Sequence, residues 1–203
     1  MTRIIDYKYK KWLRILRWIF FTYVLIGIAL YFLQDYFMFH PEKLNREQAY
    51  EFQLPYEERF IAFNAWDTMC LIHFTVDTTR TTHKGSVLYF HGNRKNVQHY
   101  APFVPFFTER GYDVWMPDYP GFGKSTGKRT EQKMYQQAWQ VFQIARQSVS
   151  ADSLIIYGKS LGTGVAAYLA SEAPCKRLIL ETGDSSSTIT SSWSKPTLAT
   201  TFG

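Results

Sequence analysis

A serine flanked by two glycines follows one apolar run and precedes a helical pattern. Gly158, Ser160 and Gly162 fit the spacing G-x-S-x-G between the apolar run 153–157 and the helical pattern 161–172. In that context the serine lies on a tight strand-to-helix turn that exposes its hydroxyl, and the glycines let the two elements pack closely. The pattern therefore predicts that Ser160 is a nucleophile.

A nucleophile of this kind also needs hydrogen-bond donors for the negative charge that develops on the attacked oxygen. The amide of Leu161 begins the helix that follows the serine, where backbone N–H groups and the helix dipole favour an anion. A second donor is expected in a loop after an earlier strand, and His91-Gly92-Asn93 follows the apolar run 86–90. We therefore expect the backbone of Leu161, Gly92 and Asn93 to form an oxyanion hole.

Strand and helix patterns alternate around these residues. Short apolar runs predict strands, and helical spacing of apolar residues, with Thr130 as a cap, predicts helices. The strands are expected at residues 59–64, 69–75, 86–90, 113–116, 153–157 and 177–180, and the helices at 102–109, 130–149 and 161–172. This alternation predicts an α/β fold, a mainly parallel sheet with helices on both faces.

The chain resembles the α/β-hydrolase superfamily, especially its N-terminally membrane-anchored serine hydrolases. The resemblance covers residues 58–182 and rests on LYFHGN (88–93), DYPGFGKSTG (118–127), TEQKMY (130–135), IIYGKSLGTG (155–164) and RLILET (177–182). It implies that Ser160 is the nucleophile, that Leu161, Gly92 and Asn93 supply the oxyanion contacts, and that esters or thioesters are hydrolysed through an acyl-enzyme.

One part of the family pattern is missing. In this superfamily an acid and then a histidine follow the nucleophile. The five histidines, His40, His73, His83, His91 and His99, all precede Ser160, and the later acidic residues are Glu172, Glu181 and Asp184. The resemblance gives way at residue 183 to a Ser/Thr-rich segment, 183–203, that we expect to be unstructured. We accordingly expect a partial hydrolase domain at 58–182, truncated at its C-terminus and lacking its last two strands.

The net charge of +6 and the pI near 9.2 come from one end of the chain. Residues 1–17 contain six basic residues and one acidic residue, which accounts for nearly all of the excess. The globular part therefore has little net charge, and we expect no nucleic-acid partner.

The segment 18–34 contains no charged residue and is strongly apolar. At about 1.5 Å per residue it reaches the lower limit for crossing a bilayer. We interpret it as a single transmembrane anchor, since the alternatives, a buried core helix and a cleaved signal peptide, fit its flanks less well. The basic segment 1–17 then lies in the cytoplasm, residues 35–57 form a linker, and the globular part lies on the opposite side.

Several other residues have simpler interpretations. We expect His91 to shape the oxyanion loop, Asp118 to cap backbone groups in its turn, and Lys159 to be solvated. Cys70 and Cys175 lack the spacing of a metal site, so neither a metal nor another cofactor is expected, although the two thiols would be able to pair in an oxidising compartment.

Two partial nucleotide-binding patterns fail on spacing. Gly123-Lys124-Ser125 resembles the end of a P-loop, but Asp118 stands where the first glycine is required. Gly162, Gly164 and Ala167 spell G-x-G-x-x-A, yet they begin too late after the strand for a dinucleotide site.

The sequence thus predicts a membrane-anchored serine hydrolase that acts on a small-molecule or lipid-like acyl substrate. Absence of the acid and histidine predicts impaired catalysis. The alternative is a catalytically inactive, truncated or interaction protein held at the membrane.

Overall fold

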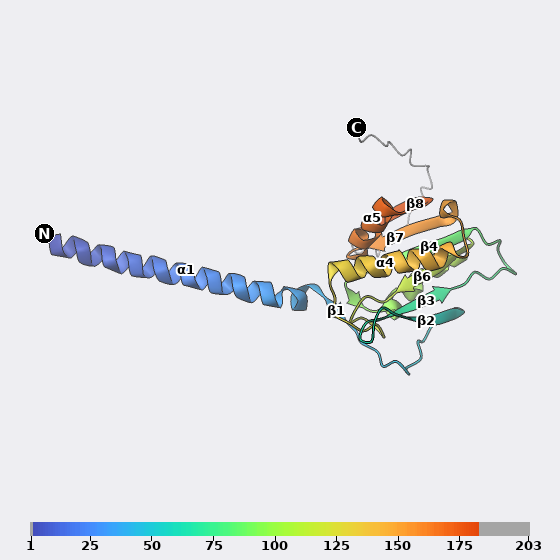
Figure 1. Cartoon of the computed structure of the whole chain (residues 1–203), viewed down its shortest axis with the longest axis horizontal. Helices are drawn as coiled ribbons and strands as arrows, with labels where there is room; N and C mark the ends of the chain where they lie inside the picture. Colours follow the sequence, from blue (N-terminus) through green and yellow to red (C-terminus); the bar gives the residue numbers. More distant parts are fainter. Residues whose placement is uncertain (1, 183–203) are drawn as a thin grey trace, which may run out of the picture.

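The computed structural model describes residues 2–182. A long helix projects from an α/β domain, and its N-terminus lies far from that domain (Figure 1). In chain order the elements are α1 (Thr2–Met38), β1 (His40–Pro41), β2 (Tyr56–Ala62), β3 (Thr68–Phe74), β4 (Gly85–Phe90), β5 (Arg94–Lys95), α2 (Val97–Tyr100), η1 (Ala101–Phe103), α3 (Pro105–Thr108), β6 (Tyr112–Pro117), α4 (Glu131–Arg146), η2 (Ala151–Ser153), β7 (Leu154–Lys159), α5 (Gly162–Glu172) and β8 (Arg177–Glu181).

Six strands form one mixed sheet in the order β2-β3-β6-β4-β7-β8. The pairs β2–β3 and β3–β6 are antiparallel, whereas β6–β4, β4–β7 and β7–β8 are parallel. Every residue of β4 and of β7 is buried, as expected for central strands covered on both faces. The predicted α/β class with a mainly parallel sheet is confirmed.

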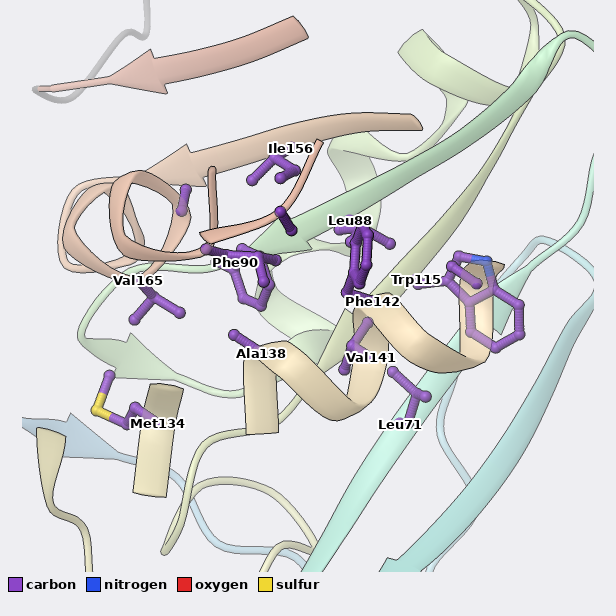
Figure 2. Packing of buried hydrophobic residues seen from close by; sticks show 14 of the residues in the cluster. Leu71, Leu88, Phe90, Trp115, Met134, Ala138, Val141, Phe142, Ile156 and Val165 are labelled. Atoms are coloured by element: carbon purple, nitrogen blue, oxygen red, sulfur yellow. The ribbon is translucent and has the colours of Figure 1, made fainter. Parts of the chain in front are cut away.

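Helices cover the two faces of the sheet. On one face α4 and α5 pack against β4, β6 and β7, and Figure 2 shows Ala138 and Val141 of α4 pointing toward Leu88 and Phe90 of β4. On the other face α2, η1 and α3 contribute a second cluster that includes Val104. Both clusters bury large apolar side chains, which supply the main stabilisation of the domain.

The helix α4 begins where its sequence predicts. Thr130 is extended and accepts a hydrogen bond from the N–H of Lys133 at 3.3 Å, and Glu131 lies in the first turn. The sequence predicted one continuous helix over 102–109, and that prediction is wrong. Here the chain forms α2, η1 and α3 in succession, because Pro102 and Pro105 lack the N–H groups that one continuous helix needs.

The segment 35–57, which we expected to act as a linker, has structure of its own. Its first four residues continue α1 to Met38, and β1 then pairs in parallel with β5. Further along, Tyr50 is buried and Phe52 packs against Phe74 with ring centroids 4.9 Å apart. The chain between the long helix and the sheet is therefore attached to the domain.

One helix among the described residues is long and apolar enough to cross a bilayer. Its stretch Tyr9–Met38 is 30 residues long and contains an 18-residue window with a mean hydropathy of 1.9, none of which is buried in the protein. At about 1.5 Å per residue the stretch would measure about 45 Å. This supports the expected apolar segment, while the anchoring itself remains a proposal.

The edge strand β8 presents apolar side chains to solvent. Leu178 is 38% and Leu180 47% exposed. Within residues 2–182 this strand pairs only with β7. The segment 183–203, for which we expected no structure, lies outside the described residues.

Candidate active site

Ser160 lies at the turn between β7 and α5, in a backbone conformation that side chains rarely adopt. Its φ is +51°, and it is one of two non-glycine residues with positive φ in residues 2–182, the other being Lys95. Such a conformation costs about 1–2 kcal/mol for an L-residue. Ser160 is also exposed, whereas Lys159 before it is buried. The predicted strained turn with an exposed hydroxyl is therefore present.

The two flanking glycines are required by close packing of the turn. A Cβ on Gly158 would lie 2.4 Å from the carbonyl oxygen of Gly162 and 2.7 Å from the Cβ of Ala166. A Cβ on Gly162 would lie 2.0 Å from the carbonyl oxygen of Phe90. These contacts join β7, α5 and β4 at the serine. By contrast, a Cβ on Gly164 would meet nothing within 4 Å.

The loop after β4 lies beside the serine. Because β4 and β7 are parallel neighbours, with Phe90 opposite Gly158, their carboxyl ends lie at the same edge of the sheet. A Cβ on Gly92 would lie 3.6 Å from the Cβ of Ser160 and 2.6 Å from the hydroxyl of Tyr100. The structure thus brings Gly92 to Ser160, as the sequence predicted.

Three backbone N–H groups near the serine are without an acceptor in the part of the chain that the structure describes. They belong to Leu161, Gly92 and Asn93. Leu161 is helical, with φ −49° and ψ −41°, and immediately precedes α5. Free N–H groups at a helix start and in an adjacent loop are suited to bind an anionic oxygen.

His91 orients this loop from within the protein. Its imidazole is fully buried, and Nδ1 donates a hydrogen bond to the carbonyl oxygen of Gly92 at 2.8 Å. Since the C=O and N–H of a trans peptide point in opposite directions, this bond turns the N–H of Asn93 away from His91. Its ring also stacks on Tyr100 at 5.1 Å and contacts Tyr119 at 4.4 Å. These contacts favour the structural role that we expected.

Asp118 is the centre of a buried polar cluster. Its carboxylate accepts hydrogen bonds from the N–H of Val97 at 2.8 Å and from the hydroxyl of Tyr50 at 2.9 Å. The Nε2 of His91 lies 3.5 Å from the same carboxylate. A Cβ on Gly123, whose φ is +48°, would lie 1.9 Å from Oδ2 of Asp118. These contacts agree with the expected backbone-capping role.

The expectation that Lys159 is solvated is wrong. Lys159 is 8% exposed, and its ammonium donates to Glu181 of the neighbouring strand, which also accepts from the hydroxyl of Tyr157. The ammonium lies 5.0 Å from the ring centroid of Phe103. Lys159 and Glu181 are opposite each other in the β7–β8 register, and that register was the signal that sequence reasoning overlooked.

A proton acceptor for Ser160 is not found among its contacts. No hydrogen bond joins Ser160 to a histidine within residues 2–182. His73 instead stacks on Trp115 and lies 3.3 Å from Asp113, as does His83. Of the acidic residues after Ser160, Glu181 is paired with Lys159, Glu172 is exposed at the end of α5, and Asp184 lies outside the described residues.

The two cysteines are unpaired thiols. Cys70 is buried in β3, and Cys175 is half-buried after α5. Burial raises the pKa of the Cys70 thiol well above its ordinary range, with the nearby Asp118 carboxylate adding to the rise. Over residues 2–182 no cluster of three His, Cys, Asp or Glu side chains could hold a metal ion. The expected lack of a metal or cofactor stays a prediction.

Comparison with known proteins identifies the family. The family model described as "alpha/beta hydrolase fold" matches residues 85–201, which is more than half of the chain. The protein belongs to the α/β-hydrolase fold family. The match passes residue 182, where we placed the end of the resemblance, and continues into the segment that lies outside the described residues.

Curated relatives match part of the chain. "Alpha/beta hydrolase domain-containing protein 17C" of Xenopus tropicalis is 32% identical over 99 residues, which cover 47% of this chain and 32% of the relative. The protein of the same description from Homo sapiens is 33% identical over 99 residues, covering 47% and 30% respectively. The matched segment thus spans about a third of the length of these relatives.

Solved structures share the fold. A thermostable carboxyl esterase from Bacillus coagulans superposes with a TM-score of 0.53 at 22% identity, covering 63% of this chain and 44% of the esterase. A soluble variant of monoglyceride lipase from Saccharomyces cerevisiae gives 0.53 at 17% identity, covering 68% and 47%. At these identities the likeness concerns the fold alone.

Proposed function

We propose that this protein is a membrane-anchored serine hydrolase that cleaves esters or thioesters through an acyl-Ser160 intermediate. The observation that supports the proposal most strongly is the exposed Ser160 at φ +51° with Gly92 beside it. The family membership and the esterase and lipase titles of the structural neighbours agree with this chemistry.

The proposed reaction proceeds in two steps. The hydroxyl oxygen of Ser160 adds to the acyl carbonyl carbon while a base takes its proton, and the leaving alcohol or thiol departs with a proton as the acyl-serine forms. Water then adds to the acyl-serine and releases the acid and the free serine. In both steps the N–H groups of Leu161, Gly92 and Asn93 would stabilise the negative oxygen, an effect worth about 3–4 kcal/mol per donor.

The mechanism needs a base, and none of the described residues is placed to take the proton of Ser160. In the family order it is a histidine after the nucleophile, and the printed sequence has none after Ser160. The second candidate function is an anchored protein without turnover, and it is favoured by the described residues, among which no histidine is hydrogen-bonded to Ser160. The six-stranded sheet and the partial coverage of the relatives are compatible with both candidates.

Turnover separates the two candidates. The full 203-residue chain in detergent would be incubated with an octanoyl ester and the matching octanoyl thioester, beside its Ser160→Ala variant. Hydrolysis by the parent chain that falls at least about a thousandfold in the variant supports the hydrolase. Equal rates for the two proteins reject it in favour of the inactive anchored protein.

The proposed anchor places α1 across the membrane, with residues 1–17 in the cytoplasm and the α/β domain on the opposite side. The support is the apolar stretch Tyr9–Met38 and the basic residues that precede and overlap its start. A reporter enzyme fused after residue 60 should be active outside the cytoplasm. Activity confined to the cytoplasm would reverse this orientation.

A further inference from the structure

A pocket of about 320 Å³ lies beside the candidate nucleophile. It is formed where the end of α1 meets the first turns of α4 and α5. Its lining residues are Asp35, Phe39, Arg129, Thr130, Glu131, Met134, Tyr135, Leu161, Gly164 and Val165. Since Leu161 directly follows Ser160, the pocket begins one residue from the serine.

The inner walls of the pocket are apolar. Met134 of α4 and Val165 of α5 belong to one buried apolar cluster (Figure 2), and Phe39 and Leu161 pack on the same cluster. Gly164 forms an open part of the wall, because a Cβ at this position would meet no atom within 4 Å. The mainly apolar surface of the pocket is thus suited to a flexible hydrocarbon group.

The end of α1 is fixed in this position by hydrogen bonds to the candidate oxyanion loop. The side-chain amide of Asn93 donates to the carbonyl oxygen of Met38 at 2.5 Å, and the carbonyl oxygen of Asn93 accepts from the N–H of His40 at 3.0 Å. The guanidinium of Arg129 lies 4.0 Å from the ring centroid of Phe39. These contacts place Phe39 in the wall of the pocket.

The charged residues of the pocket are one cation, Arg129, and two carboxylates, Asp35 and Glu131. Burial lowers the pKa of Arg129 from its ordinary value, and the nearby Asp35 carboxylate opposes that change. Glu131 accepts a hydrogen bond from the hydroxyl of Tyr135 at 2.5 Å. One cation and two carboxylates give no net attraction for an anionic ligand. Apolar contact is left as the main source of affinity.

We propose that this pocket holds the hydrocarbon chain of an acyl group drawn from a membrane-resident ester or thioester, and that Phe39, the residue directly after the anchor helix, supplies one wall. The proposal rests on the function proposed above. Two observations select this occupant, the position of the pocket next to Ser160 and the position of Phe39 directly after the apolar stretch Tyr9–Met38. A substrate that leaves the bilayer along α1 would reach the pocket directly.

The volume limits the length of the chain. A methylene group occupies about 30 Å³, similar to the volume per molecule in liquid water, so the pocket holds roughly ten carbon atoms. Medium acyl chains are therefore expected to fill it, and a two-carbon chain to leave most of it empty.

Photocrosslinking tests the site without requiring turnover. The full chain as Ser160→Ala, in phosphatidylcholine vesicles, would be irradiated with a ten-carbon fatty acid bearing a terminal diazirine. Crosslinks are scored only on residues 129–135 and 161–165, because probe dissolved in the bilayer would label α1 whether or not the pocket binds it. Filling the pocket with Gly164→Phe should lower these crosslinks by about tenfold or more. A tenfold loss of affinity is expected when about two methylene groups of the probe lose their apolar contact.

The matched control is Gly27→Phe, since Gly27 lies within α1 and its added Cβ also meets no atom within 4 Å. This variant should label as the parent does. Absence of crosslinks on residues 129–135 and 161–165, or equal crosslinking by the parent and Gly164→Phe, would overturn the pocket proposal. Failure of the hydrolase proposal has a different signature, in which these crosslinks persist but Ser160 of the unmutated chain does not react with a fluorophosphonate.

Discussion

The backbone N–H of Ser160 donates a hydrogen bond to the carbonyl oxygen of Glu181 at 2.8 Å. The side chain of Glu181 binds Lys159, the residue before the serine, so one residue of β8 holds both the serine and its predecessor. A serine at positive φ persists only where its surroundings impose that conformation. We infer that the pairing of β7 with β8 is what maintains the strained turn.

The Lys159–Glu181 pair gives the first prediction. Replacing Lys159 by Met leaves a largely buried carboxylate without its cation, and we expect the domain to lose about 2–3 kcal/mol of unfolding free energy. Thermal unfolding in detergent, followed by near-ultraviolet circular dichroism, measures the loss. Lys128→Met changes an exposed lysine and should have no effect. A Lys159→Met variant as stable as the parent would contradict the role given to this pair.

The backbone strain at Ser160 gives the second prediction. Glycine adopts positive φ without the penalty of a Cβ, so Ser160→Gly should raise the unfolding free energy by about 1 kcal/mol. Ser160→Ala keeps the Cβ and should leave stability nearly unchanged. The same unfolding measurement compares the two variants. If both variants shift stability equally, the turn stores no strain that depends on the side chain.

The contrast between Gly162 and Gly164 gives the third prediction. Gly162→Ala would place a Cβ 2.0 Å from the carbonyl oxygen of Phe90, so this variant should lose at least about 3 kcal/mol or fail to fold. Gly164→Ala adds a methyl group in open space within a helix and should gain about 0.5–1 kcal/mol. Unfolding temperatures of the two variants provide the comparison. Similar temperatures would be inconsistent with the close contact of α5 and β4.

The fourth prediction concerns Asp113, which lies away from the candidate active site. Burial raises the pKa of its carboxyl group, but hydrogen bonds from His73 and the N–H of Val76, with the charge of His83, lower it overall below the ordinary 3.8. A depressed pKa stabilises the folded state above pH 3.8 and ceases to do so as the pH falls through the lower folded value.

Asp113→Asn should therefore be less stable than the parent by about 1 kcal/mol at pH 6, and the difference should shrink at pH values below 3.8. Unfolding by urea at a series of pH values measures the difference. Asp152→Asn, at an exposed position, should match the parent throughout. A difference that persists undiminished in acid would mean that the carboxylate charge is not the cause.

Much of this arrangement is encoded locally and could be predicted from the sequence. The apolar runs locate β4, β6, β7 and β8 to within two residues, and Thr130 with Glu131 marks the start of α4. The spacing of Gly158, Ser160 and Gly162 locates the turn, because only glycine fits the contacts on either side. These features depend on a few neighbouring residues, which is why pattern reasoning finds them.

Other features depend on contacts between distant segments. The burial of Lys159 requires Glu181 of β8 and Phe103 of η1 to lie above it, which no local pattern reveals. Packing of Tyr50 onto Asp118 likewise joins residues 68 positions apart. The pocket wall at Phe39 exists because the end of α1 binds the loop at Asn93. Such contacts follow from the assembled fold.

The most direct test of the account is covalent modification of the nucleophile. Membranes containing the full chain would be treated with a fluorophosphonate probe, and the modified residue would be mapped by peptide mass spectrometry, with Ser160→Ala in parallel. The account predicts one adduct on Ser160 in the parent and no adduct in the variant. An unmodified parent, or equal modification of the parent and Ser160→Ala, would contradict it.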